Sequence, residues 1–298
     1  MTKRSEKAGG TNLCAEITLG WHDAWPAPAK INLFLHVVGR RADGYHLLQT
    51  VFRFLDHGDS LRFTPRDDGQ ILLSTPIPGV PVESDLCYRA ARLVQQTTGL
   101  VECGVEIALE KRLPMGGGLG GGSSDAATVL LALNHLWGGG LSREALQALG
   151  LQLGADVPVF VFGQNAFAEG VGEALRPVTL PEAWYVVLEP PVGVPTATIF
   201  GDAALCRNTP RTDSLNWWPD QGHNDLEPVA CRHFPVVAEY LAWLQQFAPA
   251  RMSGSGACVF AAFSTEQSAR EVLAQRPVGM RGWVAAGLDN HPLHPLKS

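Results

Sequence analysis

Residues 114–124 form a glycine-rich loop that runs directly into an apolar segment with helical spacing. The loop has six glycines in the seven positions 116–122, and the helical segment extends from Asp125 to Trp137. Glycine leaves the backbone amides uncovered and accepts positive φ angles, while the start of a helix adds unpaired N–H groups and the positive end of the helix dipole. A junction of this kind binds anions, most often phosphate.

Two common nucleotide motifs do not account for this loop. No lysine follows its last glycine, so it is not the Gly-x-x-x-x-Gly-Lys-Ser/Thr P-loop, and no other part of the chain matches that motif. Gly116, Gly118 and Gly121 satisfy Gly-x-Gly-x-x-Gly only because so many glycines match almost any such pattern. A dinucleotide-binding fold would have this loop after its first strand and an acidic residue at a later strand end, whereas Glu144 belongs to an expected helix. A flexible linker is disfavoured because Met115 and Leu119 are apolar and a strong helix follows. The loop therefore indicates a nucleotide kinase of another kind.

Composition narrows the classes of partner. The chain has 298 residues, of which 46% are hydrophobic, and this length is enough for two domains. Its formal net charge of -6 argues against nucleic acid held by a broad positive surface, so an anionic ligand has to be met by local amides and a few placed cations. A small phosphorylated ligand fits this balance.

The cysteines and the apolar segments predict a cytoplasmic protein. The six cysteines include no Cys-x-x-Cys pair, so we expect reduced thiols rather than a zinc or redox site. No signal peptide is visible, and no stretch approaches the ~20 apolar residues that span a bilayer. Neither a membrane nor a nucleic acid is expected as a partner.

The first half of the chain predicts strands followed by helices. Alternation at 30–38 indicates a strand, an Asp-Gly turn leads to a second at 47–55, and a further pair at 60–64 and 71–75 flanks a polar turn. Ser84 is the expected N-cap of a helix that closes at Gly99, and residues 101–110 alternate as a strand. After the loop helix, a short helix opens at Ser142. Asp156, two residues before Pro158, favours a helix over a strand for the segment that ends at residue 162.

The second half restarts the pattern. Strands are expected at 166–168 and 184–188, a helix from Thr196 through Leu205, and a long polar loop at 206–224 that contains Trp217 and Trp218. Residues 225–247 have helical spacing despite two prolines. A second glycine and serine loop at 252–257 leads to a strand at 258–263, a helix at 265–275 and a strand near residue 283. Mixed elements in both halves predict an α+β architecture with a domain boundary between 163 and 180.

Three segments together resemble the signature motifs of the GHMP kinases, the superfamily of galactokinase, homoserine, mevalonate and phosphomevalonate kinases. They are Pro28-Ala-Lys-Ile-Asn-Leu33, Pro114–Ser124 and Met252-Ser-Gly-Ser-Gly-Ala257. Within the superfamily, the chain is most similar to the members that act on diphosphocytidyl methylerythritol, through the strings at 41–46, 113–124, 154–158, 167–172 and 254–260. The resemblance extends from about residue 25 to the C-terminus.

The resemblance implies a two-domain kinase. It predicts an N-terminal domain of the ribosomal S5 domain 2-like class at 25–170, which binds ATP, a C-terminal ferredoxin-like domain at 171–298, and a flexible extension at 1–24. The implied reaction transfers the γ-phosphoryl of ATP to the 2-hydroxyl of diphosphocytidyl methylerythritol, with Mg²⁺ arriving on ATP rather than at a metal site built by the protein. A homodimer is compatible with this reading.

The resemblance also assigns roles to residues. Asp156 matches the catalytic aspartate that accepts the proton of the substrate hydroxyl, and Lys30 matches the cation that orients it. Residues on the ATP side are Lys111, Pro114, Met115, Gly116, Gly117, Gly118, Leu119, Gly120, Gly121, Gly122, Ser123 and Ser124. Residues on the substrate side are Asn32, Tyr45, His46, Phe52, Thr196 and Phe200, of which Tyr45 and His46 match positions that hold the cytosine. The loop at 254–257 would close over the transferring phosphate.

Several readings stay open at this point. Asp156 could instead cap a helix, Lys30 could be a solvated strand residue, and Tyr45 could pack in the core. The family often has asparagine where Asp85 stands, near the adenine pocket. The rival functions are another GHMP kinase with a smaller alcohol substrate and a catalytically silent sensor that keeps the fold.

Overall fold

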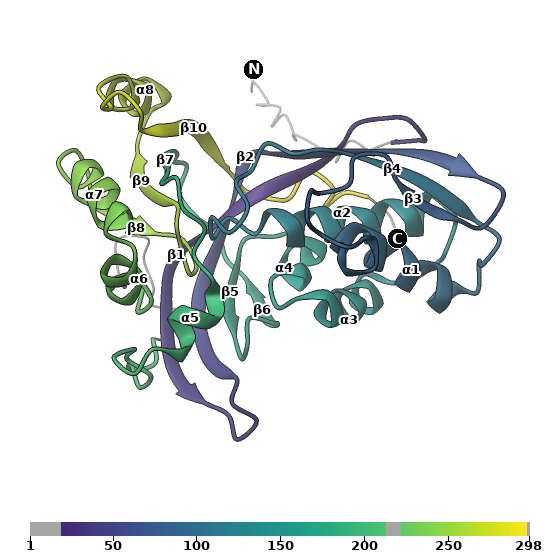
Figure 1. The fold of residues 1–298 in the computed structure, drawn as a ribbon, viewed down its shortest axis with the longest axis horizontal. Helices are drawn as coiled ribbons and strands as arrows, with labels where there is room; N and C mark the ends of the chain where they lie inside the picture. Colours follow the sequence, from purple (N-terminus) through teal and green to yellow (C-terminus); the bar gives the residue numbers. More distant parts are fainter. Residues whose placement is uncertain (1–18, 213–221, 297–298) are drawn as a thin grey trace, which may run out of the picture.

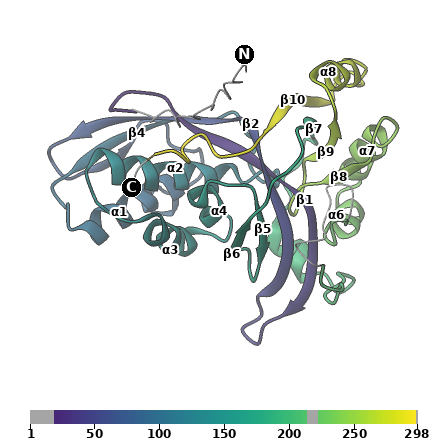
Figure 2. The same cartoon turned by 180° about the vertical axis from the view of Figure 1, so that it is seen from behind.

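The computed structural model describes residues 19–212 and 222–296. Its two halves share one long antiparallel hairpin, formed by β1 (Trp25–Arg40) and β2 (His46–Arg66). Figures 1 and 2 show these two strands running between the two groups of helices and projecting their turn beyond them. The expected flexible extension lies outside the described residues up to residue 18, whereas Leu19 and Trp21 pack against the core of the N-terminal half.

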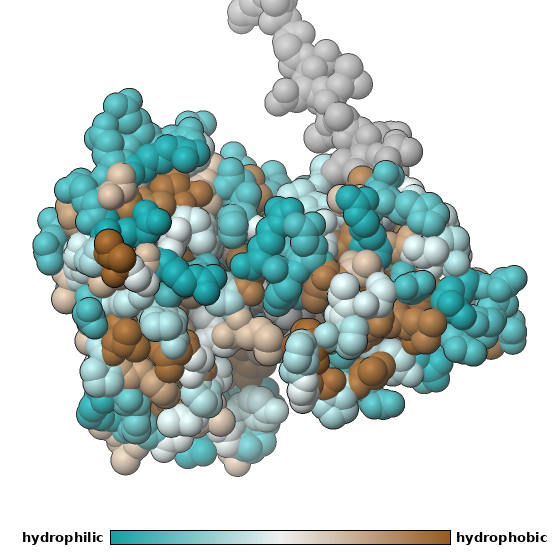
Figure 3. Space-filling model, turned by 45° about the horizontal axis from the view of Figure 1, so that its top comes forward, coloured by the Kyte–Doolittle hydropathy of each residue, from teal (hydrophilic) through white to brown (hydrophobic). Residues whose placement is uncertain are grey.

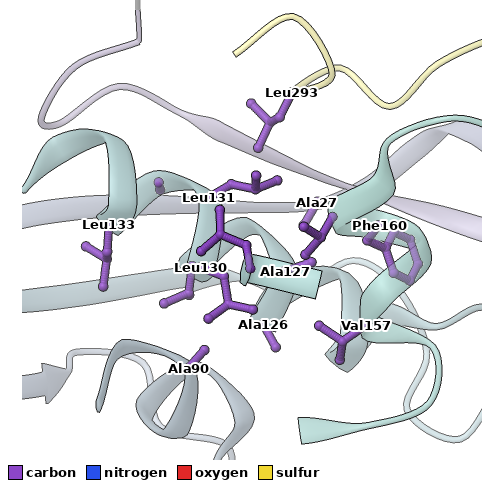
Figure 4. Close-up of a cluster of buried hydrophobic side chains, with 14 of the residues drawn as sticks. Ala27, Ala90, Ala126, Ala127, Leu130, Leu131, Leu133, Val157, Phe160 and Leu293 are labelled. Carbon is purple, nitrogen blue, oxygen red and sulfur yellow. The ribbon is translucent and has the colours of Figure 1, made fainter. Parts of the chain in front are cut away.

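The N-terminal half places a layer of helices against the sheet. It contains β3 (Ile71–Leu73), α1 (Leu86–Thr98), β4 (Gly104–Glu110), α2 (Gly121–Leu136), α3 (Arg143–Leu153), α4 (Val157–Phe162), β5 (Ala166–Glu169) and β6 (Ala174–Pro177). The apolar helix α2 is buried along nearly its whole length, among α1, α4 and β1. Figure 4 shows Leu130 and Leu131 of α2 near Val157 and Phe160 of α4, with Leu293 of the C-terminal segment on the same cluster. Leu293 and Leu296 therefore complete the core of the first half.

The C-terminal half has its own core. It contains β7 (Trp184–Glu189), α5 (Thr196–Gly201), α6 (Glu227–His233), α7 (Pro235–Leu244), β8 (Ala250–Met252), β9 (Val259–Phe263), α8 (Glu266–Ala274) and β10 (Arg281–Leu288). The strand order β3-β4-β2-β10-β7-β9-β8 makes one sheet through both halves, with β10 pairing to β2 and β7. The α+β prediction is confirmed. Within the described residues, no helix is both long enough and apolar enough to cross a membrane.

Two sequence-based strand predictions were wrong. The strands expected at 47–55 and 60–64 are one strand, β2, because Gly58 lets the chains pass closely: a Cβ there would lie 2.3 Å from the Ala27 carbonyl oxygen. The segment at 71–75 does not form a hairpin with β2. Its strand β3 pairs in parallel with β4, a long-range partner that local pattern does not reveal.

Three helix predictions also need correction. Ser84 does not cap α1; the Asp85 carboxylate does, by accepting hydrogen bonds from the amides of Cys87 and Tyr88. The helix expected from Thr196 through Leu205 ends at Gly201, and its N-cap is Pro195. The helical spacing at 225–247 is divided into α6 and α7 at Phe234, whose ψ of 80° is not helical, because the following proline disfavours the helical conformation.

Other local predictions hold. Residues 157–162 are helical, α1 ends at Gly99 with φ of 74°, and Ser142 caps α3 through the amide of Ala145. The predicted loop at 206–224 lies partly outside the described residues, including Trp217 and Trp218. The five described cysteines form no disulfide.

Candidate active site

A cavity of about 550 Å³ lies between the two halves of the molecule. In the space-filling view the surface is recessed between the two halves (Figure 3). The cavity is lined by β1, β2, the glycine loop, the start of α4, α5 and the second glycine loop. Most of the expected site residues line it: Lys30, Asn32, Phe52, Lys111, Asp156, Thr196, Phe200 and the loop from Pro114 to Ser123.

The glycine loop takes its shape from its glycines and from the loop opposite. Gly116, Gly118 and Gly120 have φ angles of 67°, 74° and 71°, which side chains with a Cβ rarely adopt. A Cβ on Gly118 would lie only 2.0 Å from the Ser253 carbonyl oxygen. The amides of Ala257 and Cys258 donate to the carbonyls of Gly116 and Gly117 at 3.2 and 3.0 Å. The two glycine loops are thus packed backbone to backbone.

Only some of the residues at the start of α2 line the cavity. Gly121, Gly122 and Ser123 line it, whereas Ser124 is fully buried and does not. The Ser124 hydroxyl has no hydrogen-bond partner among the described residues. Of the two serines at the start of α2, Ser123 is therefore the one that lines the cavity.

Lys30 is held at the floor of the cavity by three contacts. Its Nζ lies 3.2 Å from Asp156 Oδ2 and donates to Asn32 Oδ1 at 2.7 Å and to the Gly118 carbonyl at 3.2 Å. The lysine is 2% exposed, so the reading of a solvated strand residue is wrong. Its Nζ also lies 5.3 Å from the centre of the Phe52 ring, within the range of a cation–π contact.

Asp156 presents an open carboxylate beside this lysine. It stands at the N-cap position of α4, yet its side chain makes no capping hydrogen bond, and it is 37% exposed. The helix-cap reading of this residue is therefore wrong. A fixed ammonium next to a carboxylate that faces the cavity is an arrangement that can orient a hydroxyl and accept its proton.

Lys111 belongs to a second group of charges, under the other end of the glycine loop. Its Nζ lies 2.5 Å from Asp59 Oδ2 and 2.9 Å from Asp125 Oδ2. Asp59 Oδ1 also accepts the amides of Arg112 and Leu113, at 2.6 and 2.8 Å, which fixes the chain as it enters the loop. Burial lowers the pKa of Lys111, but the two carboxylates outweigh that effect and raise it.

Asp125, one of the two carboxyls that contact Lys111, has a raised pKa. Burial, partly offset by Lys111 and reinforced by Asp59, raises its pKa from 3.8 to about 7. Sequence reasoning missed Asp59 and Asp125 as parts of the site. Asp59 lies in the middle of β2 and Asp125 lies inside α2, so neither stood out in the sequence as a site residue, and only the fold brings them to Lys111.

The residues expected on the substrate side do not all line the cavity. His46 stacks on Phe200, with ring centroids 4.8 Å apart, and Phe200 lines the cavity. Thr196 Oγ1 lies 2.8 Å from Ser255 Oγ, which links α5 to the second glycine loop. Tyr45 is 64% exposed on the β1–β2 turn and does not line the cavity, so it is not packed in the core.

Comparison with known sequences places this site in a family. A sequence model of the GHMP kinases N terminal domain matches residues 85–164, and one of the GHMP kinases C terminal domain matches residues 211–277. A relative from Dechloromonas aromatica, a 4-diphosphocytidyl-2-C-methyl-D-erythritol kinase, is 65% identical over 270 residues, covering 90% of this chain and 98% of the relative. The chain belongs to the GHMP kinases.

Other members of the GHMP kinases agree with this placement. The 4-diphosphocytidyl-2-C-methyl-D-erythritol kinase of Thiobacillus denitrificans is 62% identical, covering 91% of this chain and 97% of the relative. A crystal structure of 4-(cytidine 5'-diphospho)-2C-methyl-D-erythritol kinase matches with a TM-score of 0.77 at 36% identity, covering 89% of this chain and 99% of that one. The homoserine kinase of Cytophaga hutchinsonii matches with a TM-score of 0.66 at 17% identity, over 94% and 98% of the two chains, and shares the GHMP kinase fold.

Proposed function

We propose that this chain transfers the γ-phosphoryl group of ATP to the 2-hydroxyl of 4-diphosphocytidyl-2-C-methyl-D-erythritol, a step of the non-mevalonate isoprenoid pathway. The observation that carries the proposal is the contact of 3.2 Å between Lys30 Nζ and Asp156 Oδ2, next to the glycine loop. The names of the relatives at 65% and 62% identity supply the substrate.

Asp156 acts as the general base in this proposal. Its carboxylate is open to the cavity, so it can take the proton of the 2-hydroxyl as the oxygen attacks the γ-phosphorus. Lys30 cannot move away from it, because Asn32 and the Gly118 carbonyl hold the same ammonium. Its positive charge therefore orients the Asp156 carboxylate and lies close to the charge that develops on the transferring group.

The glycine loop binds the ATP phosphates. The residues from Pro114 to Ser123 line the cavity, and the backbone amides at the start of α2, together with the Ser123 hydroxyl, are the donors available to phosphate oxygens. Ser124 would contribute its amide or support the turn from below. Lys111 would lie near the adenine, and the loop at 254–257 would close over the transferring phosphate.

Mg²⁺ would accompany ATP as its phosphate complex. Within residues 19–212 and 222–296, no three His, Cys, Asp or Glu side chains converge as a metal site would require. The ion would hold the phosphate oxygens together and offset their charge. Asp156, which is 37% exposed, is a carboxylate that lines the same cavity as the loop on which such a complex would bind.

The substrate's cytidine would bind at the opposite end of the cavity. Phe200, with His46 stacked on it, offers an aromatic surface there, and Tyr45 can reach the base only if its turn moves toward the cavity. Asn32, Phe52 and Thr196 also line the cavity and would contact the methylerythritol part. Domains at 25–170 and 171–298, a cytoplasmic location and a homodimer stay predictions.

The decisive experiment measures ADP release from purified protein with ATP, Mg²⁺ and 4-diphosphocytidyl-2-C-methyl-D-erythritol. We expect activity in the wild type, little in Asp156→Asn, and competition by cytidine nucleotides. A wild type that releases no ADP with this substrate would contradict the function. Indifference to cytidine nucleotides would favour another GHMP kinase, and tight binding without turnover would favour a silent sensor.

A further inference from the structure

The Arg207 guanidinium links His46 to Phe200, and Phe200 lines the cavity. Arg207 donates from Nε to His46 Nε2 at 3.1 Å, from one terminal nitrogen to the Leu205 carbonyl at 3.1 Å, and from the other to the carbonyls of Phe200 and Asp202, both at 2.8 Å. Three of these acceptors, the carbonyls of Phe200, Asp202 and Leu205, lie at the C-terminal end of α5 or just after it. The fourth is the imidazole of a different segment, the start of β2.

The contact with Arg207 decides which nitrogen of His46 carries the proton. An arginine only donates, so His46 Nε2 must accept, and the proton of the neutral ring then lies on Nδ1. Burial, followed by the positive charges of Arg207 and Arg40, lowers the pKa of His46, which keeps the ring neutral at neutral pH. The imidazole is thus held with Nδ1–H as its only donor.

The same contact fixes the position of the ring. His46 and Phe200 stack at a centroid distance of 4.8 Å with 29° between their planes. Arg207 donates hydrogen bonds to both partners of this stack, to the ring nitrogen Nε2 of His46 and to the backbone carbonyl of Phe200. Without the guanidinium, the start of β2 and the end of α5 would lose this polar link, and the ring could turn about its own bonds.

We propose that Arg207 is a positioning residue for the pyrimidine base of the substrate, because it holds His46 stacked on Phe200 as the Nδ1–H tautomer. This inference rests on the proposed function, since it takes the base bound at this end to be cytosine. Cytosine presents ring and carbonyl acceptors, and a single fixed N–H donor beside an aromatic surface matches one of them. The role of Arg207 is carried through His46 and requires no contact with the substrate.

The test uses cytidine 5'-diphosphate as the probe and two independent readouts. Binding of this nucleotide and of ADP is measured by calorimetry, and the protonated nitrogen of His46 is identified from ¹⁵N chemical shifts of the imidazole. In Arg207→Met we expect affinity for cytidine 5'-diphosphate to fall roughly tenfold, the order of one lost hydrogen bond to a charged group, with ADP affinity unchanged. We also expect the preference for Nδ1–H to disappear.

Two further variants separate positioning from general support. Arg207→Lys keeps the charge but not the planar fork that reaches four acceptors, so it should bind the cytidine nucleotide nearly as weakly as Arg207→Met. Arg143→Met is the matched control, because Arg143 also donates to four carbonyls, those of Val161, Leu293, His294 and Leu296, far along the chain from the base-binding end. It should lower the melting temperature and leave affinity for cytidine 5'-diphosphate unchanged.

The outcomes distinguish this inference from the proposed function. A wild type that does not bind cytidine 5'-diphosphate contradicts the function itself. A wild type that binds it, but carries the His46 proton on Nε2, overturns the inference even if every Arg207 variant fails to fold. Equal nucleotide binding in the wild type and Arg207→Met, or an equal loss in Arg143→Met, overturns it as well.

Discussion

Two lysines lie against the same glycine loop and differ in the carboxylates they meet. Lys30 contacts one aspartate, Asp156, which is 37% exposed, and its other partners are a neutral amide and a carbonyl. Lys111 contacts two aspartates, Asp59 and Asp125, which are 0% and 2% exposed. The Asp156 carboxylate is open to a ligand, whereas those of Asp59 and Asp125 are buried against Lys111.

We interpret this difference as one between a carboxylate that can take part in catalysis, Asp156, and two carboxylates that stabilise the fold, Asp59 and Asp125. A general base must reach a substrate proton, so its carboxylate has to keep a free, accessible oxygen, as Asp156 does. The Asp59 oxygens instead accept hydrogen bonds from Lys111 and from two backbone amides at the entry of the loop. Lysine–aspartate pairs next to one glycine loop thus have different roles, and the burial of the carboxylates decides which role each can have.

The largest expected effect is on the Lys30 side. Asp156→Asn should reduce the rate of ADP release by roughly 10²–10⁴-fold, because the amide cannot accept the proton. The melting temperature should fall only modestly, because the asparagine oxygen can still accept a hydrogen bond from Lys30 Nζ. Steady-state assays and thermal unfolding of the same preparations check this. Full activity in the variant would remove Asp156 from the chemistry.

On the Lys111 side the expected effect is on stability. Lys111→Met leaves two buried aspartates without their counter-charge, which should lower the free energy of unfolding by about 3–5 kcal/mol. Urea unfolding measures the loss, and Lys111→Met combined with Asp125→Asn should recover part of it. If Lys111→Met unfolds like the wild type and only its KM for ATP changes, the group serves binding rather than construction.

The loop between the two lysines offers a smaller and graded test. Gly118→Ala forces a positive φ on alanine and drives its Cβ into the Ser253 carbonyl, so we expect a loss of about 2 kcal/mol or more in unfolding free energy. Gly122→Ala is the control: it lies in α2, and its Cβ would meet Leu86 at an ordinary 3.5 Å. It should be neutral or stabilise by up to about 1 kcal/mol. Equal urea midpoints for the two variants would contradict the packing described for the two loops.

The smallest effect is a pH dependence that comes from Asp125. Its folded pKa of about 7 lies above its ordinary value of 3.8, so between about pH 4 and 7 the unfolded chain loses this proton first. The contribution of Asp125 to stability is therefore present at low pH and falls as the pH rises toward 7. Urea unfolding at pH 5 and 7.5 should show a smaller decline for Asp125→Asn than for the wild type. An equal decline in both proteins would place this pH dependence elsewhere.

Local signals predicted much of the fold and failed where distant segments compete. The glycine loop, the helix after it and the helix opened by Asp156 depend on neighbouring residues, and all three are present. The continuity of β2 and the parallel pairing of β3 with β4 depend on backbone segments far away in the chain. Alternation of apolar residues alone therefore predicted two strands in place of β2 and the wrong partner for β3.

By itself, the sequence determined the glycine loop, Lys30 and Asp156, because these lie in short strings whose residue types suit phosphate binding and proton transfer. Only the tertiary structure decided that the Asp156 carboxylate is exposed, whereas those of Asp59 and Asp125 are buried against Lys111. It also decided that Arg207 donates a hydrogen bond to His46. The physical reason is that charge, burial and tautomer are set by the atoms around a side chain, and those atoms come from segments up to 161 residues apart.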